Sequence, residues 1–326
     1  MTGLDSIARA LAALLAIASL PVMAQQSAIP RIGFLSINSE SAMAARVEAL
    51  RYGLRELGYV EGRSIQIEFR YAAGVADRLG PLSVELLAQK VEVIVTEGPS
   101  ATRAARQATT IVPIVMGQDP DPVATGFVAS LSKPGGNITG LTSLRTDLSA
   151  KRVEMLKRAV PKLKLIAVVG ARIPGTPDAL QQTLVAAQAF GARIHYVELA
   201  GPKDLARAFN EAREAGTQAM ILLANPVTLS RRSEIAQLAL NERLPVMYYT
   251  SEFVDDGGLI AYGVNVPDLF RRAATYVDKI LKGAKAGELP VEQPTKFELV
   301  INLNTAKQIG LTIPQALVYQ ADRVIE

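Results

Sequence analysis

The chain alternates short apolar runs with longer stretches in which apolar residues recur every three or four positions. The short runs have the length and β-branched content of buried strands, and the longer stretches are typical of amphipathic helices. Strands joined by single helices must run parallel, so the pattern predicts an α/β fold with parallel central sheets. Residues 65–71 alternate apolar and polar side chains, as in a strand near a sheet edge. The buried strands are expected at residues 32–35, 93–95, 114–116, 165–169, 220–223 and 246–249.

Three breaks in this alternation divide the chain into two Rossmann-like lobes. The first follows the turn cluster Lys133–Asn137, and the second is expected between Tyr249 and Tyr262. A third is expected at residues 287–294, where Gly and Pro return. A three-strand hinge of this kind lets two lobes rock about a few residues, which favours a ligand receptor. The expected lobes are residues 29–145 with 258–288, and residues 146–257 with 289–326.

Residues 1–24 are expected to be a secretory signal peptide. An apolar core at residues 10–20 follows Arg9 and is about half as long as a membrane-spanning helix requires. Pro21 ends the core, and Val22–Ala24 places small residues where signal peptidase cleaves. We therefore expect cleavage after Ala24 and a periplasmic location. The chain has no cysteine, so it is not expected to be a lipoprotein.

The composition favours two domains and argues against a nucleic-acid partner. A chain of 326 residues with 49% apolar residues can bury about three quarters of its surface and tends to divide into two domains. The net charge of +4 is spread along the chain, and its densest pairs, Arg231–Arg232 and Arg271–Arg272, fall on expected helices. Arginines on helix surfaces usually face solvent, so nucleic-acid binding is not expected.

Polar residues directly after the expected strands are the candidate ligand-binding residues, because ligands of open parallel sheets bind beyond the carboxyl ends of the strands. The turn Gly98–Thr102 is the strongest candidate, since the hydroxyls and amides of a helix start can hold a carboxylate. A capped helix with no ligand explains this turn equally well. Asp119, before Pro120, is also typical of a turn. The full set of candidates is Ser36, Asn38, Gly98, Ser100, Ala101, Thr102, Gln118, Asp119, Arg172, Asn225, Thr250, Ser251 and the aromatic Tyr262.

The sequence lacks the usual patterns of catalysis, so neither an enzyme nor a cofactor or metal is expected. His195, the one histidine, lies in an alternating strand pattern, and a chain without cysteine has no thiolate nucleophile. A single histidine also excludes a His-rich metal site. No Gly-rich fingerprint for a dinucleotide or a nucleoside triphosphate follows a strand. An α/β hydrolase or racemase is the less favoured alternative.

Several motifs follow one another along nearly the whole mature chain. They include Gly53–Gly62, Gly98–Thr102, Asp119–Val123, Leu131–Gly140 and Gly258–Gly263. In this order they resemble the ABC-transporter substrate-binding family that includes bacterial tryptophan and phenylalanine receptors. The resemblance implies a periplasmic binding protein of type I, whose two lobes close on a small solute. It also implies delivery of that solute to a membrane permease driven by a separate ATPase.

The resemblance carries an expectation about the ligand. In amino-acid receptors of this family, the turn matching Gly98–Thr102 helps hold the ligand's carboxylate, and acidic or amide groups of the second lobe meet its amine. Here Asn225–Pro226 and Gly170–Arg172 depart from the more usual Asp-Asn and Tyr-Asn-Pro, and we hypothesise that Arg172 favours a second acidic group. We expect a monomer that binds a carboxylate-bearing solute, either an amino acid or an aromatic or organic acid. A sensor subunit that signals to a membrane kinase would use the same fold and site.

Overall fold

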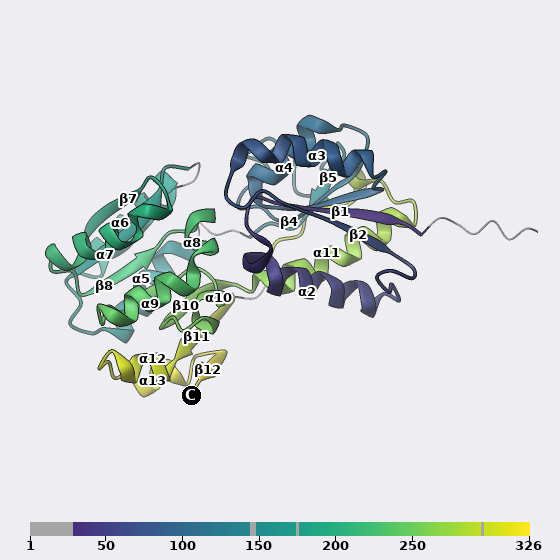
Figure 1. The fold of residues 1–326 in the computed structure, drawn as a ribbon. Coiled ribbons are helices and arrows are strands. Elements are labelled where there is room, and N and C mark those ends of the chain that lie inside the picture. The colour runs from purple at the N-terminus through teal and green to yellow at the C-terminus, as the bar shows by residue number, and fades with distance from the viewer. Residues whose placement is uncertain (1–28, 144–147, 174–175, 295–296) are drawn as a thin grey trace, which may run out of the picture.

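The computed structural model describes residues 29–143, 148–173, 176–294 and 297–326. These residues form two α/β lobes, each built on its own sheet with helices on both faces (Figure 1). Helices on both faces bury the apolar strands, as the sequence pattern predicts. The expected signal peptide, residues 1–24, lies outside the described residues.

The first lobe has a parallel sheet with the strand order β2-β1-β3-β4-β5. Helices α2 and α11 cover one face of this sheet, and α3 and α4 cover the other (Figure 1). The edge position of β2 confirms the prediction from the alternating pattern of residues 65–71. The elements of this lobe are β1 (Arg31–Ser36), α2 (Glu40–Glu56), β2 (Gln66–Tyr71), η1 (Ala76–Arg78), α3 (Leu79–Ala88), β3 (Val93–Glu97), α4 (Gly98–Ala108), β4 (Ile114–Gln118), β5 (Ile138–Gly140), α11 (Val266–Leu281) and η4 (Ala286–Glu288).

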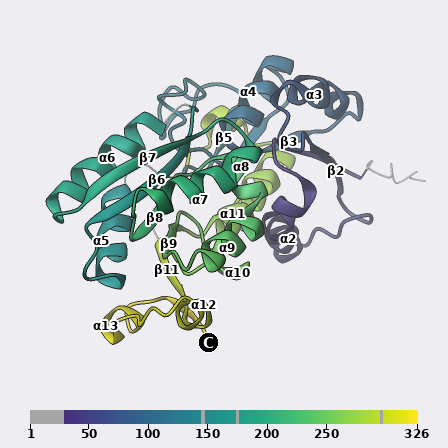
Figure 2. The same cartoon turned by 60° about the vertical axis from the view of Figure 1, so that its left-hand side comes forward.

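The second lobe has a larger sheet with the strand order β12-β11-β10-β9-β8-β6-β7. Strand β11 runs antiparallel to β10, because it enters from the first lobe instead of following a crossover helix within its own lobe. Helices α12 and α13 lie together beside the C-terminus (Figure 2), and β12 lies next to them (Figure 1). The elements are α5 (Ser149–Ala159), β6 (Leu165–Ala171), α6 (Thr176–Ala189), β7 (Arg193–Leu199), η3 (Pro202–Asp204), α7 (Leu205–Glu214), β8 (Ala219–Leu222), α8 (Pro226–Ser230), α9 (Arg232–Asn241), β9 (Val246–Tyr248), α10 (Glu252–Asp255), β10 (Ile260–Val264), β11 (Phe297–Asn302), α12 (Leu303–Gln308), α13 (Gln315–Val318) and β12 (Arg323–Ile325).

The chain passes between the lobes three times, and two of these connections lie side by side. Leu141, after β5, pairs with Glu292 of the third connection. The Thr142 amide donates a hydrogen bond to the Glu292 carbonyl (2.9 Å). The second connection is short, since β10 ends at Val264 and α11 begins at Val266. Short, paired connections of this kind are suited to hinge motion.

The position of β10 differs from the sequence prediction, which assigned residues 258–288 to the first lobe. Strand β10 pairs with β9 and β11 in the second sheet, while the following α11 and η4 pack on the first lobe. Gly257 and Gly258 form the turn before β10, and a Cβ at Gly258 would lie 2.5 Å from the Tyr248 ring. The glycines therefore serve a tight turn and close packing, while the chain changes lobe at Asn265, the N-cap of α11.

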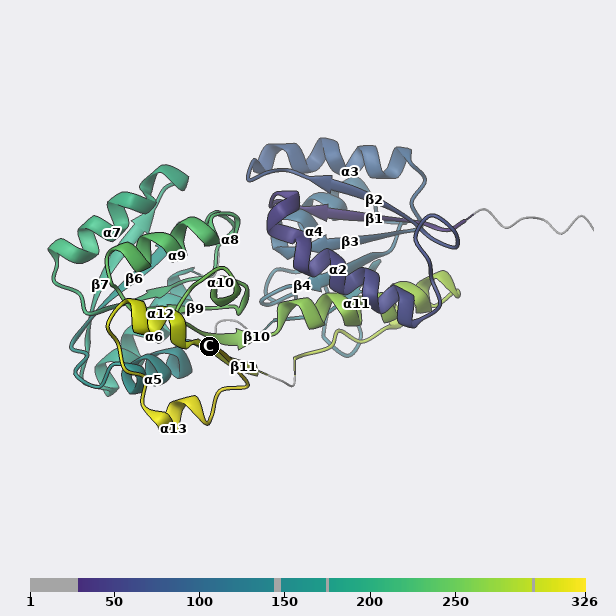
Figure 3. The ribbon, with the colours of Figure 1, turned by 60° about the horizontal axis from the view of Figure 1, so that its bottom comes forward.

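Helix α11 packs closely along α2, although the two helices are far apart in the sequence (Figure 3). Gly53 of α2 permits this approach, because a Cβ there would lie 2.2 Å from the Arg271 carbonyl oxygen. The Ser39 hydroxyl caps α2 by accepting a hydrogen bond from the Ala42 amide (3.3 Å). The first lobe is thus built from two distant segments that are held as one packed unit.

Candidate ligand-binding site between the lobes

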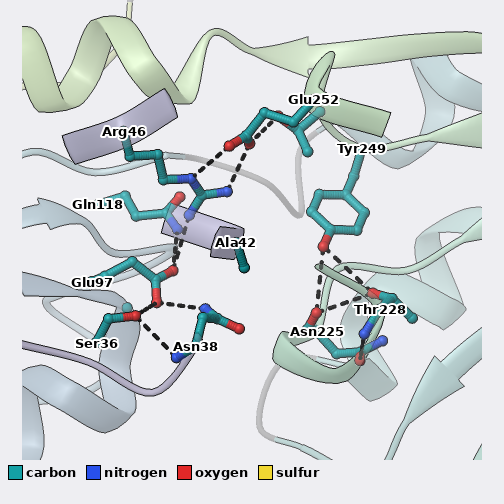
Figure 4. A network of polar contacts seen from close by, with 12 residues as sticks. Ser36, Asn38, Ala42, Arg46, Glu97, Gln118, Asn225, Thr228, Tyr249 and Glu252 are labelled. Atoms are coloured by element: carbon teal, nitrogen blue, oxygen red, sulfur yellow. Dashed lines mark hydrogen bonds and ion pairs between the residues drawn. The ribbon is translucent and has the colours of Figure 1, made fainter. Parts of the chain in front are cut away.

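The carboxyl ends of β1, β3 and β4 gather polar side chains around one buried carboxylate, Glu97. The strand register sets Ser36 beside Glu97, and Glu97 beside Gln118. Glu97 Oε2 accepts hydrogen bonds from Ser36 Oγ (3.1 Å) and Asn38 Nδ2 (2.8 Å). Glu97 Oε1 accepts from Gln118 Nε2 (2.9 Å) and from Arg46 Nη1 (3.0 Å). The four donors hold this carboxylate rigidly at the edge of the first lobe (Figure 4).

Arg46 of α2 joins this cluster to the second lobe. Its Nε and Nη2 donate to Glu252 Oε1 (3.1 Å) and Oε2 (2.8 Å), so the pair is bidentate (Figure 4). Arg46 has a relative exposure of 0%, and both carboxylates are also buried. A buried arginine that contacts carboxylates of both lobes ties the two sheets together at their carboxyl ends.

The charge of Glu252 depends on Arg46. Burial by itself disfavours the charged carboxylate, but the charge and hydrogen bonds of Arg46 outweigh it, so the pKa of Glu252 is lowered from its ordinary value. The Thr250 hydroxyl supports the same carboxylate by donating to Oε2 (3.1 Å). Burial also acts to lower the pKa of the Arg46 guanidinium, yet the nearby carboxylates raise it, so Arg46 stays charged.

The second lobe presents further polar groups across from Asn38 (Figure 4). Asn225 caps α8, and its Oδ1 accepts a hydrogen bond from the Thr228 amide (2.9 Å). The Tyr249 hydroxyl lies 3.4 Å from both the Asn225 carbonyl oxygen and Thr228 Oγ1. A second contact between the lobes comes from Arg232, whose Nη1 donates to the Ala42 carbonyl (3.3 Å).

Several sequence candidates converge on this region. Asn225 lies in the second lobe across from Asn38, with its side-chain amide bonded to Leu223 and Thr228 of its own lobe, and Ser251 is buried beside Glu252. Asp119 is buried directly after β4, and its Oδ1 accepts a hydrogen bond from the Asp121 amide (3.0 Å), which is the geometry of a turn former. The candidates that belong to the hydrogen-bonded network itself are Ser36, Asn38, Gln118 and Thr250.

Other candidates lie away from this network or point elsewhere. The Arg172 side chain is 86% exposed and pairs with Glu198 (2.9 Å). Ala101 is buried in the core of the first lobe, and the Thr102 hydroxyl is bonded within it to the Gly98 carbonyl (3.1 Å) and to Thr96 Oγ1 (2.8 Å). Ser100 is exposed, and Tyr262 is half-buried between two apolar clusters. Gly98 has a φ of 76°, and a Cβ there would meet open space.

The central residue of the network, Arg46, was missing from the sequence candidates. It lies on the buried face of α2, three residues after Met43 and four before Leu50. A charged residue within an apolar helical stripe is the signal that identifies it. Glu97 is the last residue of β3 and Glu252 is the first residue of α10, and neither was in the candidate set.

Within the described ranges, the structure has neither a metal-binding cluster nor a membrane-spanning helix. No group of three or more His, Cys, Asp or Glu side chains there is arranged to hold a metal ion. Nor does any helix between residues 29 and 326, outside the three short gaps, have the length and apolar character needed to cross a membrane.

Comparison with known proteins identifies the family. A family model described as ABC transporter substrate binding protein matches residues 31–325. The chain belongs to this family. Its family is one of substrate-binding proteins and not of enzymes, and the match confirms the resemblance found in the sequence motifs.

Individual relatives of this substrate-binding protein support the same assignment. It is 26% identical over 263 residues to a tyrosine-binding protein of Clostridioides difficile (strain R20291), covering 79% of this chain and 74% of the relative. It is similar to an ABC domain from Streptococcus pneumonia in complex with L-Trp, at a TM-score of 0.81 and 23% identity. A ligand-free, open substrate binding protein from Clostridium difficile gives a TM-score of 0.67 at 22% identity. Both structural matches cover 91% of this chain and 99% of the other, and the expected two-lobed fold is confirmed.

Proposed function

We propose that this protein is the periplasmic receptor of an ABC importer, which binds a small carboxylate-bearing solute between its lobes by hinge closure. The observation that carries this proposal is the buried contact of Arg46 with Glu97 of the first lobe and Glu252 of the second. Such a contact forms only when the carboxyl ends of the two sheets come together. Ligands of open α/β sheets bind at that edge of the sheet.

A closed arrangement of the lobes has further support. One apolar cluster runs continuously from Phe34 and Leu50 of the first lobe to Tyr249 and Phe253 of the second. At similar identity and equal coverage, the chain superposes better on the L-Trp complex than on the ligand-free, open relative. Both observations favour a structure in which the lobes have closed about the hinge.

Binding and closure are linked by the difference in affinity between the two forms. A solute that contacts both lobes binds the closed form more tightly, and it shifts the equilibrium by only that difference. The Arg46–Glu252 pair adds a contact of the protein's own that also favours closure. A solute held by both lobes is then presented to a permease as one rigid unit, with the ATPase on the far side of the membrane.

The proposal is tested by a thermal-shift screen followed by scattering. The screen includes amino acids, aromatic and organic acids, amines and sugars, because a solute selective for the folded state raises the melting temperature. Small-angle scattering with and without the best binder then measures closure. The Arg46–Glu252 pair already favours the closed form without solute, so we expect the solute to increase the closed population further and to lower the radius of gyration. Chemical conversion of that solute, or the absence of any binder, would contradict the receptor function.

Export and transport need separate measurements. Sequencing the amino terminus of the protein from a periplasmic fraction tests cleavage after Ala24. Uptake of the identified solute into vesicles that contain a permease and an ATPase encoded beside this protein tests the importer role. Solute-dependent activation of a membrane kinase without uptake would instead identify a sensor subunit.

A further inference from the structure

The amides of Asn38 and Gln118 are held in one orientation by Glu97. A carboxylate accepts hydrogen bonds and donates none, so each amide must turn its NH2 group towards Glu97. The observed bonds from Asn38 Nδ2 (2.8 Å) and Gln118 Nε2 (2.9 Å) have this geometry. Turning either amide over would place its oxygen against the carboxylate. The direction of both amide oxygens is therefore set by the protein itself.

Both amide oxygens lack a hydrogen-bond donor in the part of the chain that the structure describes. Asn38 Oδ1 and Gln118 Oε1 are buried, and each side chain has a relative exposure of 1%. Figure 4 shows the Asn38 oxygen turned away from Glu97, towards Asn225 of the second lobe. Buried acceptors are nearly always paired in native proteins, so two unpaired ones around the same carboxylate indicate that a donor comes from outside the chain.

The charge of the network favours a positively charged donor. Arg46 neutralises only one of its two partners, Glu97 and Glu252, which leaves the three side chains with one excess negative charge. The positive charge of Arg232 also helps to lower the pKa of Glu252, but Arg232 is itself paired with Asp256 (2.9 Å). An excess buried charge is costly unless a charge of opposite sign comes close to it.

We propose that Asn38 Oδ1 and Gln118 Oε1 accept N–H hydrogen bonds from a protonated amine of the solute. This inference rests on the proposed receptor function and narrows it, because it selects amine-bearing solutes over simple aromatic or organic acids. It also assigns the amine to the first lobe, whereas the family resemblance led us to expect amine-binding groups on the second lobe.

The ligand-side test compares matched solutes by calorimetry. L-Tyrosine and L-tryptophan are each measured beside the acid that lacks the amine, the amine that lacks the carboxylate, and the N,N,N-trimethyl derivative. The last keeps the positive charge but has no N–H donor. If another amine-bearing solute from the screen binds better, its matched set is measured in the same way. We expect removal or trimethylation of the amine to weaken binding at least about 100-fold, because a site built around hydrogen bonds rejects analogues that leave it unpaired.

Each outcome separates the inference from the receptor function. An acid without an amine that binds within about fivefold of its amino parent overturns the inference and leaves the receptor function standing. A sugar as the best binder would also overturn the inference and leave the receptor function standing. If no member of the screen binds, the receptor proposal and the inference both fail.

The protein-side test replaces Gln118→Met, which keeps the length of the side chain and removes the amide. We expect affinity for the amine-bearing solute to fall about 10-fold to 100-fold, while affinity for the matched acid stays within about threefold. The control is Gln107→Met, at an exposed position of α4, which should leave both affinities unchanged. If Gln118 had only a general structural role, its replacement would lower the affinity for both solutes equally, and that result would contradict the inference. If Gln118→Met does not fold, the comparison of matched solutes still decides.

Discussion

The two lobes contribute differently to the site. In the first lobe, four donors from two strand ends and one helix converge on a single carboxylate, Glu97. In the second lobe, Asn225 and Thr228 bond mostly to their own backbone, and the Tyr249 hydroxyl lies 3.4 Å from both the Asn225 carbonyl oxygen and Thr228 Oγ1. Among the residues that the structure describes, Glu252 is the second-lobe side chain that is bonded to Arg46 of this network. The first lobe thus holds its part of the network with its own side chains, and the second lobe joins that network through the carboxylate of Glu252.

The largest effect is expected from Arg46→Met, which removes the positive charge that both carboxylates share. Glu97 and Glu252 would stay buried without their main partner, so we expect a loss of about 3–5 kcal/mol in the free energy of unfolding. Urea denaturation measures this loss in the free energy of unfolding. Arg55→Ala on the same helix is the control, because Arg55 is exposed and should change stability by less than about 0.5 kcal/mol. Equal effects of the two substitutions would contradict a preorganised first lobe.

Packing of α11 on α2 is the next feature of the first lobe to test. Gly53→Ala would push a methyl group against the Arg271 carbonyl, so we expect the free energy of unfolding to fall by about 1–3 kcal/mol. Gly80→Ala is the matched control, because a Cβ at this position of α3 meets no atom within 4 Å. For Gly80→Ala we expect the free energy of unfolding to rise by up to about 1 kcal/mol. Similar melting temperatures for the two variants would show that close helix packing does not hold the first lobe together.

Glu252→Gln tests the single contribution of the second lobe to the ionic network. In the open form Glu252 would be solvated, so the substitution should affect closure more than unfolding. We expect a larger radius of gyration without solute, and a loss of about tenfold in solute affinity, equivalent to about 1.4 kcal/mol. Glu234→Gln, at an exposed position of α9, is the control. A closed shape retained by Glu252→Gln would remove this ion pair from the closure mechanism.

Acid should open the lobes through the same carboxylate. The pKa of Glu252 is lowered in the closed form, so the closed form gains stability from this group above the ordinary Glu pKa of about 4.3. That contribution is lost as the pH falls through the lowered pKa, while Arg46 remains charged. Scattering of the solute-free protein between about pH 7 and pH 3 should show opening at the acid end. Glu252→Gln should show no such acid-dependent step, and an identical profile for both proteins would contradict the assignment.

The sequence predicted the fold well because apolar periodicity reports burial directly. It also placed Ser36, Asn38, Gln118 and Thr250 after strands, and the structure joins them in one hydrogen-bonded network, while their role in ligand binding stays a prediction. It missed Arg46 because a helix position shows which face is buried, but not that two distant carboxylates meet it there. The change of lobe after β10 was missed for a related reason. Gly257 and Gly258 indicate a turn, and only the pairing of β10 shows which sheet that turn serves.

The smallest effect is expected from Arg172→Ala, which tests the hypothesis that this residue selects a second acidic group. Arg172 is exposed and its salt bridge with Glu198 is a surface pair, so stability should change by less than about 1 kcal/mol. Solute affinity should stay within about twofold, because neither residue belongs to the network around Glu97. Calorimetry measures the affinity of the variant for the best monoacid and for its dicarboxylate counterpart. A selective loss of the dicarboxylate would place Arg172 in the site and would give the second lobe a charged contribution besides Glu252.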